Sequence, residues 1–408
     1  MEELLDCFAP GRRVYLPGGS AEILPLAAAL AAEPERLAGV EITAALLPSM
    51  NRTDYTARAT GAQLTVFMMS PALEASAAAG RLRLLPLCYS ATGRYLAQDF
   101  EPDVAIAHVA PAGAGGRCSL GISADFAPLV WPRAAFRILV VNARMPAIAR
   151  APHLALADAD LVVEIDAPLV AEDEPVPDAV TQAIAASVAA LVPDGAAVQC
   201  GIGGIPGATW RCLAGHRDLV IASGMVTPPL RTIAEAGALR EGGGHRAGIA
   251  LGGPEFYDWL AETNFIEMVP VTQSHDSAAL ARLDAFTSIN SALELDLFGQ
   301  VNLEWRGTTA VSGVGGAPDF ARAAFQSRGG RAITALRATA GKGAISRIVP
   351  RLVGPTVSLP RSDVDTVVTE YGIADLRGRS TDERAAALIA IAAPDHRDAL
   401  ERAWRPVR

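Results

Sequence analysis

The sequence has little lysine, little cysteine and no long apolar segment. Lys342 is the single lysine among 35 basic residues, so a Schiff base has one candidate. The five cysteines form no C-x-x-C pair and the six histidines never stand at metal-ligand spacing, which predicts buried thiols in a reducing cytoplasm and no metal site. Apolar runs rarely exceed eight residues and the start MEELLDCF lacks a signal-peptide pattern, so no membrane segment is expected.

The charge balance argues against a protein that covers phosphate backbones. The 44 acidic residues exceed the basic ones and give a net charge of -9. Nucleic-acid binding is therefore not expected. Half of the 408 residues are hydrophobic, and 37 glycines and 28 prolines punctuate them, which indicates a turn-rich globular protein of two or three domains.

The chain alternates short β-branched runs with stretches rich in alanine and leucine. Such alternation predicts an α/β protein with mostly parallel sheets, because parallel strands need crossover helices between them. The strands expected in the N-terminal part are Arg13 to Leu16, Glu41 to Leu47, Gln63 to Met68, Arg81 to Leu85, Asp103 to Val109 and Arg137 to Asn142.

A boundary and a repeat organise the chain. The segment DAPLVAEDEPVPD, residues 166–178, combines three prolines with several acids and no helical period, which is typical of a surface linker. We therefore divide the chain into an N-terminal half (1–170), a linker (171–178) and a C-terminal half (179–408). A strand, a glycine-rich turn and an apolar helix begin at Val14 and again at Val198, an offset of 184 residues.

The same offset relates a second pair of segments, which end in turns at Gly115 and Gly299. Two matches at one offset in a glycine-rich chain can arise by chance or by internal duplication. A duplication predicts an α/β fold of two similar open halves, with a ligand cleft between them.

Two glycine-rich segments are candidate anion sites. GIGGIPGA (201–208) follows an expected strand and opens a helix, and SGVGGAPDF (312–320) precedes another helix. Backbone N–H groups at such helix starts can bind an anion or an oxyanion. The first segment lacks the full dinucleotide pattern and the G-K-[ST] of a P-loop. A turn that needs glycine only for its dihedral angles is the alternative for both.

Three carboxylates are candidates for acid–base chemistry. Glu294 and Asp296 alternate with leucines in INSALELDL and share one strand face. The alternative is a strand face that is simply exposed to solvent, because such a strand shows the same alternation. Glu370 lies near a strand-to-helix junction in VVTEYGIADLRGRS, where charge pairing at a domain surface is the alternative.

Four ordered segments resemble the acetyl-CoA hydrolase / 4-hydroxybutyrate CoA-transferase family of the class I CoA-transferase superfamily. They are DGAAVQCGIGGIPGA, INSALELDLFGQVN, SGVGGAPDFARAA and the stretch from AISRIVPRL through VVTEYGIADLRGRSTDERAAALIAIAAPDHRDAL, and the likeness covers nearly the whole chain. It implies CoA as a substrate, no tightly bound cofactor and a homodimer. It also implies CoA or oxyanion contacts from Gly201, Ile202, Gly203, Gly204, Ile205, Gly313, Val314, Gly315 and Gly316.

The resemblance also implies a nucleophilic glutamate, and the aligned position in this chain is not a glutamate. The family motif G-x-H-[ST]-E-M aligns without gaps on VIASGM, which puts Ser223 at the Ser/Thr, Gly224 at the glutamate and Met225 at the methionine. A glycine has no side chain to attack a thioester, so the glutamyl-CoA route is excluded at this position. We expect a vacated space there, and a substrate pocket that includes Ser223, Met225 and Asn290.

These observations predict an enzyme that acts on an acyl-CoA thioester by hydrolysis, lyase or acyl-transfer chemistry. Glu294 or Glu370 would be its general base. One alternative is a catalytically inactive CoA-binding or partner subunit. Another is a genuine CoA-transferase or hydrolase with a displaced carboxylate such as Glu294. A nicotinamide dehydrogenase fits poorly, because the ribose-binding acid is missing.

Overall fold

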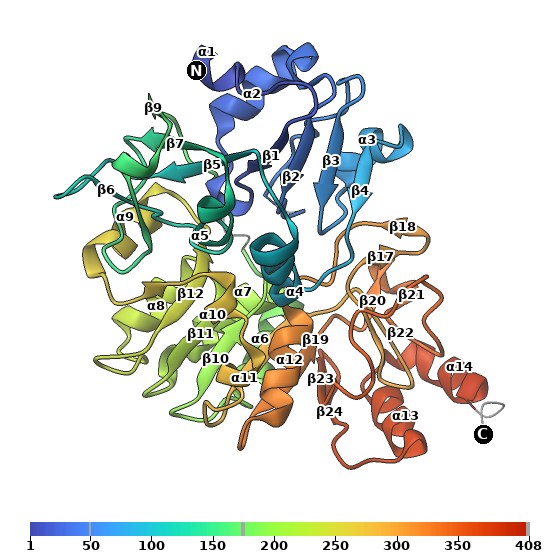
Figure 1. Ribbon diagram of the computed structural model, residues 1–408. Coiled ribbons are helices and arrows are strands. Elements are labelled where there is room, and N and C mark those ends of the chain that lie inside the picture. The colour runs from blue at the N-terminus through green and yellow to red at the C-terminus, as the bar shows by residue number, and fades with distance from the viewer. Residues whose placement is uncertain (49, 173–175, 405–408) are drawn as a thin grey trace. The chain divides into compact units, whose positions relative to one another are not determined.

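The computed structural model describes residues 1–48, 50–172 and 176–404, which form two compact units (Figure 1). Unit 1 comprises 1–173, 244–274 and 311–315, and unit 2 comprises 174–243, 275–310 and 316–408. The sequence division into 1–170, 171–178 and 179–408 stays a prediction, and positions 173–175 of its linker lie outside the described residues. Two segments from beyond that linker belong to unit 1.

A parallel sheet forms the centre of unit 1. Its strand order is β4-β3-β2-β1-β5-β7-β9, and each neighbouring pair is parallel. The strands are β1 (Arg13–Leu16), β2 (Glu41–Ala44), β3 (Gln63–Val66), β4 (Leu82–Leu84), β5 (Val104–Val109), β7 (Phe136–Asn142) and β9 (Leu161–Ile165). All six strands expected in this part are confirmed, and the expected β2 and β3 end two or three residues earlier than predicted.

The rest of unit 1 consists of helices and short strands. The helices of unit 1 are α1 (Glu2–Leu5), α2 (Leu24–Ala32), α3 (Glu74–Ala78), α4 (Tyr89–Arg94), α5 (Ala127–Val130), α9 (Pro254–Thr263) and α10 (Val271–Ser274). Its short strands are β6 (Arg117–Ser119), which pairs with β8 (His153–Ala155), and β12 (Arg246–Ala250), which pairs with β13 (Glu267–Met268).

Unit 2 is built on a second, mostly parallel sheet. Within this unit the strand order is β11-β10-β14-β19-β23-β24, and β24 alone among these strands runs antiparallel to its neighbour. The strands are β10 (Ala197–Cys200), β11 (Val220–Val226), β14 (Thr287–Ser291), β19 (Arg331–Ala335), β23 (Thr366–Thr369) and β24 (Gly372–Asp375).

The remaining elements of unit 2 are helices and small sheets. The helices are α6 (Ala179–Ala189), α7 (Gly204–Cys212), α8 (Pro229–Glu235), α11 (Ser277–Leu280), α12 (Ala317–Gln326), α13 (Thr381–Ala390) and α14 (Pro394–Trp404). The small sheets contain β15 (Glu294–Asp296), β16 (Val301–Asn302), β17 (Trp305–Arg306), β18 (Thr309–Ala310), β20 (Thr339–Ala340), β21 (Ile345–Ser346) and β22 (Ile348–Val349).

The two units use the same local strand arrangement. An offset of 184 residues carries β1 onto β10 and overlays β5 on β14. In each unit the first of these strands lies between the next strand in sequence (β2 or β11) and the later one (β5 or β14). This agreement confirms the predicted α/β class with two sheet-rich halves.

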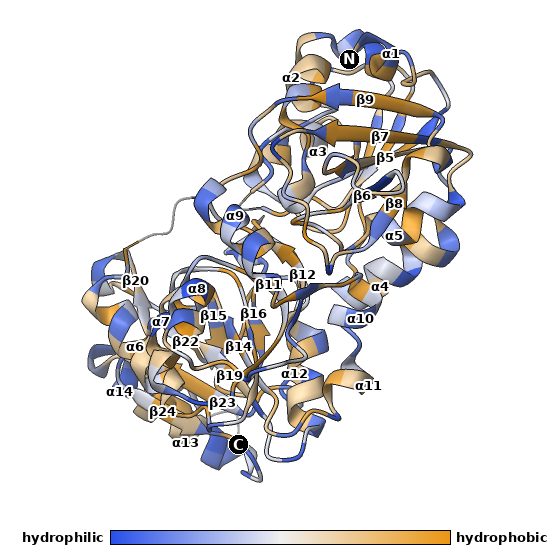
Figure 2. Ribbon diagram, turned by 90° about the vertical axis from the view of Figure 1, so that its left-hand side faces the viewer, coloured by the Kyte–Doolittle hydropathy of each residue, from blue (hydrophilic) through white to orange (hydrophobic). Residues whose placement is uncertain are grey.

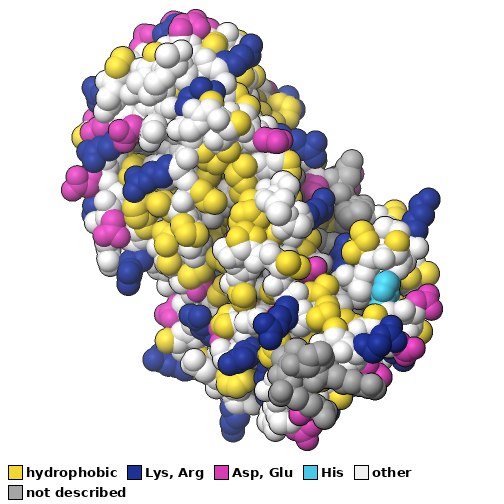
Figure 3. Space-filling view, turned by 90° about the vertical axis from the view of Figure 1, so that its right-hand side faces the viewer, with side chains coloured by type: hydrophobic (Ala, Val, Ile, Leu, Met, Phe, Trp, Pro, Cys, Tyr) yellow, Lys and Arg dark blue, Asp and Glu magenta, His cyan; other side chains and the backbone are white. Residues whose placement is uncertain are grey.

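Hydrophobic burial explains the parallel sheets. All six residues of β5, VAIAHV, are buried, as expected for a strand with helices on both faces. Figure 2 shows the hydrophobic colour running along β7 beside it. The edge strand β4 differs, because Leu84 is 41 % exposed there. Figure 3 looks at the molecule from the side on which β4 lies in Figure 1, and it shows hydrophobic side chains gathered on the upper part of that surface. No helix in the described residues is long and apolar enough to cross a membrane.

Capping residues set the starts of the helices around the unit 2 sheet. Asp178 accepts the Thr181 N–H at 2.9 Å at the start of α6. Ser380 and Glu383 form a reciprocal capping box at the start of α13. Pro318 lies in the first turn of α12, where the missing N–H costs no helical hydrogen bond. The helix starts are therefore specified locally, and α12 begins at Ala317, within the segment SGVGGAPDF rather than after it.

Candidate functional site

Three predicted site residues lie at one level of the unit 2 sheet. The register pairs Val198 of β10 with Ile221 of β11 and with Thr287 of β14. Extending this register by three residues brings Gly201, Gly224 and Asn290 to the same level. This level is at the carboxyl ends of the strands, where α/β proteins commonly bind their ligands.

Gly201 and Asn290 contact each other at this level. A β-carbon built on Gly201 would lie 2.6 Å from Asn290 Oδ1, so only glycine allows this approach. The Asn290 amide also exchanges two hydrogen bonds of 3.2 Å with Gln199: Gln199 Nε2 donates to Asn290 Oδ1, and Asn290 Nδ2 donates to Gln199 Oε1. The amide pair fixes the orientation of Asn290 beside the first glycine-rich turn.

The first glycine-rich turn leads directly into α7. Gly203 adopts φ 111°, a conformation that a residue with a side chain rarely takes, and α7 begins at the next residue. Ile202, Gly203 and Gly204 are exposed, whereas Ile205 is buried. Among the described residues no side chain caps α7, so its first N–H groups remain available to an anion.

The second glycine-rich loop is fixed through its carbonyl groups. Ser312 O accepts the Met69 N–H at 3.2 Å, and Gly315 O accepts the Tyr89 N–H at 3.0 Å. A β-carbon on Gly313 would lie 2.8 Å from the Met68 side chain and 3.0 Å from its Cα. Residues 311–315 therefore pack closely within unit 1, and glycine is required for that packing.

A histidine fills the space beside Gly224. A β-carbon built on Gly224 would lie 2.8 Å from His275 Cε1 and 2.9 Å from His275 Nε2. A β-carbon built on Gly316 would lie 2.4 Å from the same Nε2. The Phe320 ring of α12 packs on the imidazole with centroids 4.6 Å apart. The vacated space expected at Gly224 is therefore occupied by an imidazole ring.

Burial determines the protonation state of His275. The side chain is buried, and desolvation lowers its pKa to about 3. At neutral pH the ring is therefore uncharged, with one nitrogen able to accept a proton. Sequence reasoning missed this residue, because it lies 51 positions after Gly224 and belongs to no recognisable local motif. Its glycine neighbours give the only signal, and that signal is visible only in three dimensions.

The two β11 neighbours of Gly224 are buried in the strand. The Ser223 hydroxyl donates to Met225 O at 2.7 Å, and Met225 is itself buried. Successive side chains alternate between the faces of a strand, so both lie on the face opposite to the one that Gly224 presents. They support the strand that carries Gly224, and their role as pocket residues stays a prediction.

The predicted carboxylates lie at other places in unit 2. Glu294 is on β15, opposite Asn302 of β16, and burial is the largest cause that raises its pKa above the ordinary value. Glu370 follows β23, and its Oε2 accepts the Ala338 N–H at 2.8 Å. Asp296 is fully buried and accepts the Gln300 N–H at 2.9 Å. The alternative prediction that this strand face is exposed to solvent is therefore wrong for Asp296.

Arginines near Glu370 provide positive charge. Burial is the main cause that lowers the pKa of Arg347, and the like charges of Arg306 and Arg337 lower it further. The Glu370 carboxylate acts in the opposite direction. Like charges that depress one another's pKa produce a positive potential, which attracts anions. Within residues 1–48, 50–172 and 176–404, no group of three or more His, Cys, Asp and Glu side chains is arranged to hold a metal ion.

Comparisons with known proteins relate the chain to one family. The family model of the acetyl-CoA hydrolase/transferase C-terminal domain matches residues 252–404. The chain is 37 % identical over 305 residues to the 4-hydroxybutyrate coenzyme A transferase of Clostridium kluyveri, covering 73 % of this chain and 71 % of that one. RipA of Yersinia pestis has a TM-score of 0.89 at 28 % identity, over 100 % of this chain and 96 % of that structure.

A 4-hydroxybutyrate CoA-transferase of Porphyromonas gingivalis has a TM-score of 0.81 at 30 % identity, with the same coverage of both chains. The fold, the parallel sheets and these likenesses define a class of proteins that act on acyl-CoA thioesters. The chain belongs to the acetyl-CoA hydrolase/transferase family.

Proposed function

We propose that this protein is an enzyme that acts on an acyl-CoA thioester without forming a glutamyl-CoA intermediate. The observation that carries the proposal is the residue at position 224. Glycine offers no nucleophile, and the space that a side chain would need there is taken by His275. An exchange of CoA through a covalently bound glutamate therefore has no attacking group at this position.

Several features support the retention of CoA binding. The glycine turn at residues 202–204 is exposed and lies at the N-terminus of α7, which carries partial positive charge. The arginines around Arg347 add full positive charges within the same unit. CoA carries several phosphate charges, so both features favour it, even though the whole protein has a net charge of -9.

The alternative of a displaced carboxylate has less support. The Glu370 carboxylate accepts a backbone N–H from Ala338, the residue that precedes β20. Glu294 belongs to a different sheet from Gly224, and it lies opposite Asn302 rather than beside the glycine. Neither carboxylate is brought next to Gly224 by the strand register. The general-base role that the sequence suggests for either residue stays a prediction.

Incubation with a panel of acyl-CoAs tests the proposed function. Acetyl-CoA, butyryl-CoA, isobutyryl-CoA and succinyl-CoA would each be followed by mass spectrometry, with and without acetate as an acceptor. The expected result is consumption of at least one thioester at a rate that does not depend on acetate. Inertness towards all four would contradict the proposal, and CoA binding by calorimetry would then identify a non-catalytic binding subunit.

The homodimer that the family resemblance implies and the cytoplasmic location that the composition suggests both stay predictions. A homodimer would elute and sediment at twice the chain mass. Sedimentation velocity with and without CoA measures this directly, and a monomer under both conditions would contradict it.

A further inference from the structure

We propose that Arg306 and Arg347 of unit 2 bind a carboxylate at the far end of the acyl group, so that dicarboxylic acyl-CoAs are the substrates that this site takes. The inference rests on the proposed function, because it needs an acyl-CoA at the carboxyl ends of the unit 2 strands. It deepens that function by naming the class of acyl group and the residues that select it.

Both arginines lack an ionic partner. Arg306 is exposed at the end of β17, and Arg347 is partly exposed directly before β22. In the part of the chain that the structure describes, neither guanidinium group forms a hydrogen bond or an ion pair. An arginine keeps its charge at every physiological pH and has five N–H groups to donate. These two side chains can therefore bind an anion that enters from solvent.

The backbone fixes the position of Arg347. Its N–H donates to Ala338 O at 2.9 Å, and its carbonyl group accepts the Leu295 N–H at 2.9 Å. Ala338 follows β19, and Leu295 belongs to β15, the strand that comes after β14 in the sequence. Arg347 therefore lies just beyond the carboxyl ends of β14 and β19, between the segments that continue from them.

The same end of the sheet carries Asn290 and the first glycine-rich turn. Asn290 of β14 pairs with Thr334 of β19, and Ala338 lies four residues further along the chain. Four residues span at most about 14 Å even when they are fully extended. The long side chain of Arg347 and an acyl chain of four or five carbons can together bridge a separation of this size.

The charges around Arg347 are unbalanced. Arg337 has a partner of its own, since its guanidinium group lies 2.7 Å from the Asp178 carboxylate. The Glu370 carboxylate attracts Arg347 without forming an ion pair with it. Arg306 and Arg347 against Glu370 leave one uncompensated positive charge, which a singly charged carboxylate neutralises and a doubly charged phosphate group exceeds. The long-range attraction of these arginines for CoA does not require its phosphates to contact them.

The protein without ligand disfavours the charge of Arg347. Burial and the like charges of Arg306 and Arg337 lower the pKa of Arg347, which means that its surroundings oppose its charged form. A bound anion removes part of this opposition, because an opposite charge nearby favours the charged form of a base. The planar fork of N–H groups also matches the two oxygens of a carboxylate. A carboxylate is therefore a favourable occupant in charge and in shape.

Acyl-chain selectivity tests the proposal. The kcat/KM for thioester consumption would be measured with glutaryl-CoA and valeryl-CoA, whose five-carbon acyl groups differ in the terminal carboxylate. We expect the wild-type protein to favour glutaryl-CoA by at least about tenfold. Arg347→Gln should lose about 10- to 100-fold with glutaryl-CoA and less than about threefold with valeryl-CoA, because a hydrogen bond to a charged group is lost for one substrate alone.

Two further variants sharpen this comparison. Arg306→Gln should lose about three- to tenfold with glutaryl-CoA, since an exposed charge contributes less than a partly buried one. This variant also keeps the test informative if Arg347→Gln does not fold. Arg282→Gln is the matched control, because Arg282 is an exposed arginine of unit 2 that has no ion pair among the described residues. It should change neither rate.

A binding measurement makes the test independent of turnover. Glutarate should raise the melting temperature of the wild-type protein but not that of Arg347→Gln, and valerate should raise neither. Without ligand, Arg347→Gln should unfold at no lower a urea concentration than the wild type, because the substitution removes a charge that its surroundings oppose. A lower unfolding midpoint together with unchanged selectivity would overturn the proposal and make Arg347 a structural residue.

The outcomes separate this inference from the proposed function. If the wild-type protein consumes no acyl-CoA, the proposed function is wrong, and glutarate binding still tests the arginines directly. If the wild type is active and Arg347→Gln keeps the same preference between the two substrates, the function stands and the proposal is overturned. Equal losses with glutaryl-CoA and valeryl-CoA, together with weaker binding of free CoA, would overturn it too and assign the arginines to a phosphate group of CoA.

Discussion

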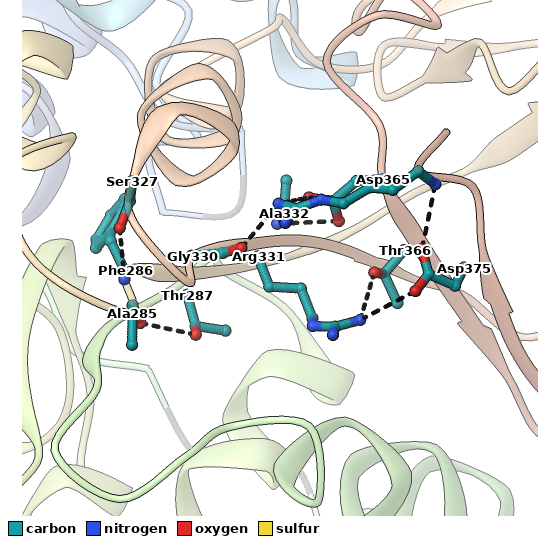
Figure 4. Close-up of polar contacts among 11 residues, drawn as sticks. Ala285, Phe286, Thr287, Ser327, Gly330, Arg331, Ala332, Asp365, Thr366 and Asp375 are labelled. Atoms are coloured by element: carbon teal, nitrogen blue, oxygen red, sulfur yellow. Dashed lines mark hydrogen bonds and ion pairs between the residues drawn. The ribbon is translucent and has the colours of Figure 1, made fainter. Parts of the chain in front are cut away.

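At the amino ends of β14, β19 and β23, charged side chains of unit 2 pair with one another, whereas near the carboxyl end of β11 two glycines lie against a neutral imidazole. Figure 4 shows the amino-end cluster, in which Asp365 accepts the Ala332 N–H and Arg331 reaches towards Thr366 and Asp375. Asp365 is fully buried and also pairs with Arg377. One end of the sheet has its charges satisfied internally, and the other has glycines packed closely around a titratable ring.

This difference separates the requirements of stability from those of chemistry. A buried carboxylate without a partner is costly, so the amino-end cluster tolerates little change. A group that has to react needs access to the reacting atoms. Substitutions at the amino ends should therefore affect the free energy of unfolding, and substitutions at the carboxyl ends should affect turnover.

The largest expected effect on stability is that of Asp365→Ala. The substitution leaves the buried Ala332 N–H without its acceptor and removes the partner of Arg377. Loss of one member of a buried pair costs about 3 kcal/mol or more. Urea unfolding followed by circular dichroism measures the loss. Asp284→Ala, in an exposed pair with Arg328, is the control and should leave stability nearly unchanged.

Two glycine-to-alanine substitutions compare the ends directly. At Gly330, a β-carbon would lie 2.5 Å from Ala324 O and 2.8 Å from Phe286 O, which are backbone atoms that cannot move cheaply. We expect Gly330→Ala to cost about 1–3 kcal/mol of stability, with turnover per folded molecule unchanged. Gly224→Ala meets the His275 side chain instead, and should lose at least about tenfold in kcat with a smaller loss of stability. Equal losses of stability and of kcat in Gly330→Ala and Gly224→Ala would contradict the proposed difference between the amino and carboxyl ends of the sheet.

Acid sensitivity should come partly from the carboxyl end. The pKa of His275 is about 3 in the folded protein and about 6.5 in an unfolded chain, so the unfolded state takes up the proton first as the pH falls. This stabilising contribution is fully present above pH 6.5 and is lost as the pH falls towards 3. His275→Gln should therefore lessen the loss of stability between pH 6 and 4 by about 1.4 kcal/mol per pH unit. Equal slopes for both proteins would show that the ring is not desolvated.

The smallest expected effect is a gain of CoA exchange. Gly224→Glu alone should remain inactive in exchange between acetyl-CoA and propionate, because its β-carbon collides with the imidazole. The double variant Gly224→Glu/His275→Ala provides the missing space, and it should exchange CoA slowly but measurably above the single variant. Exchange by the single variant alone would contradict the position assigned to His275.

Much of the fold could be predicted from the sequence because its signals are local. Strands such as β1 and β5 are short apolar runs bounded by turns, and the 184-residue offset follows from the recurrence of strand, glycine turn and helix. The membership of residues 244–274 and 311–315 in unit 1 has no such signal. It depends on packing between segments that are far apart in the sequence.

The candidate site was predictable only in part, for the same reason. Gly201 follows from the pattern of strand, glycine turn and helix, and Asn290 follows from the family resemblance. The register brings both to the level of Gly224. The motif alignment shows that position 224 is not a glutamate. It does not show which side chain occupies the space beside that position. A sequence motif cannot predict that His275 fills this space, because the two residues lie 51 positions apart and no short, recognisable spacing connects them.

We expect this protein to cleave a thioester without acylating a glutamate. The most direct measurement is peptide mass spectrometry after incubation with acetyl-CoA followed by hydroxylamine, which converts activated glutamyl groups to hydroxamates. We predict that thiol is released while every glutamate, including Glu294 and Glu370, stays unmodified. A hydroxamate at either residue, formed in proportion to turnover, would contradict the account.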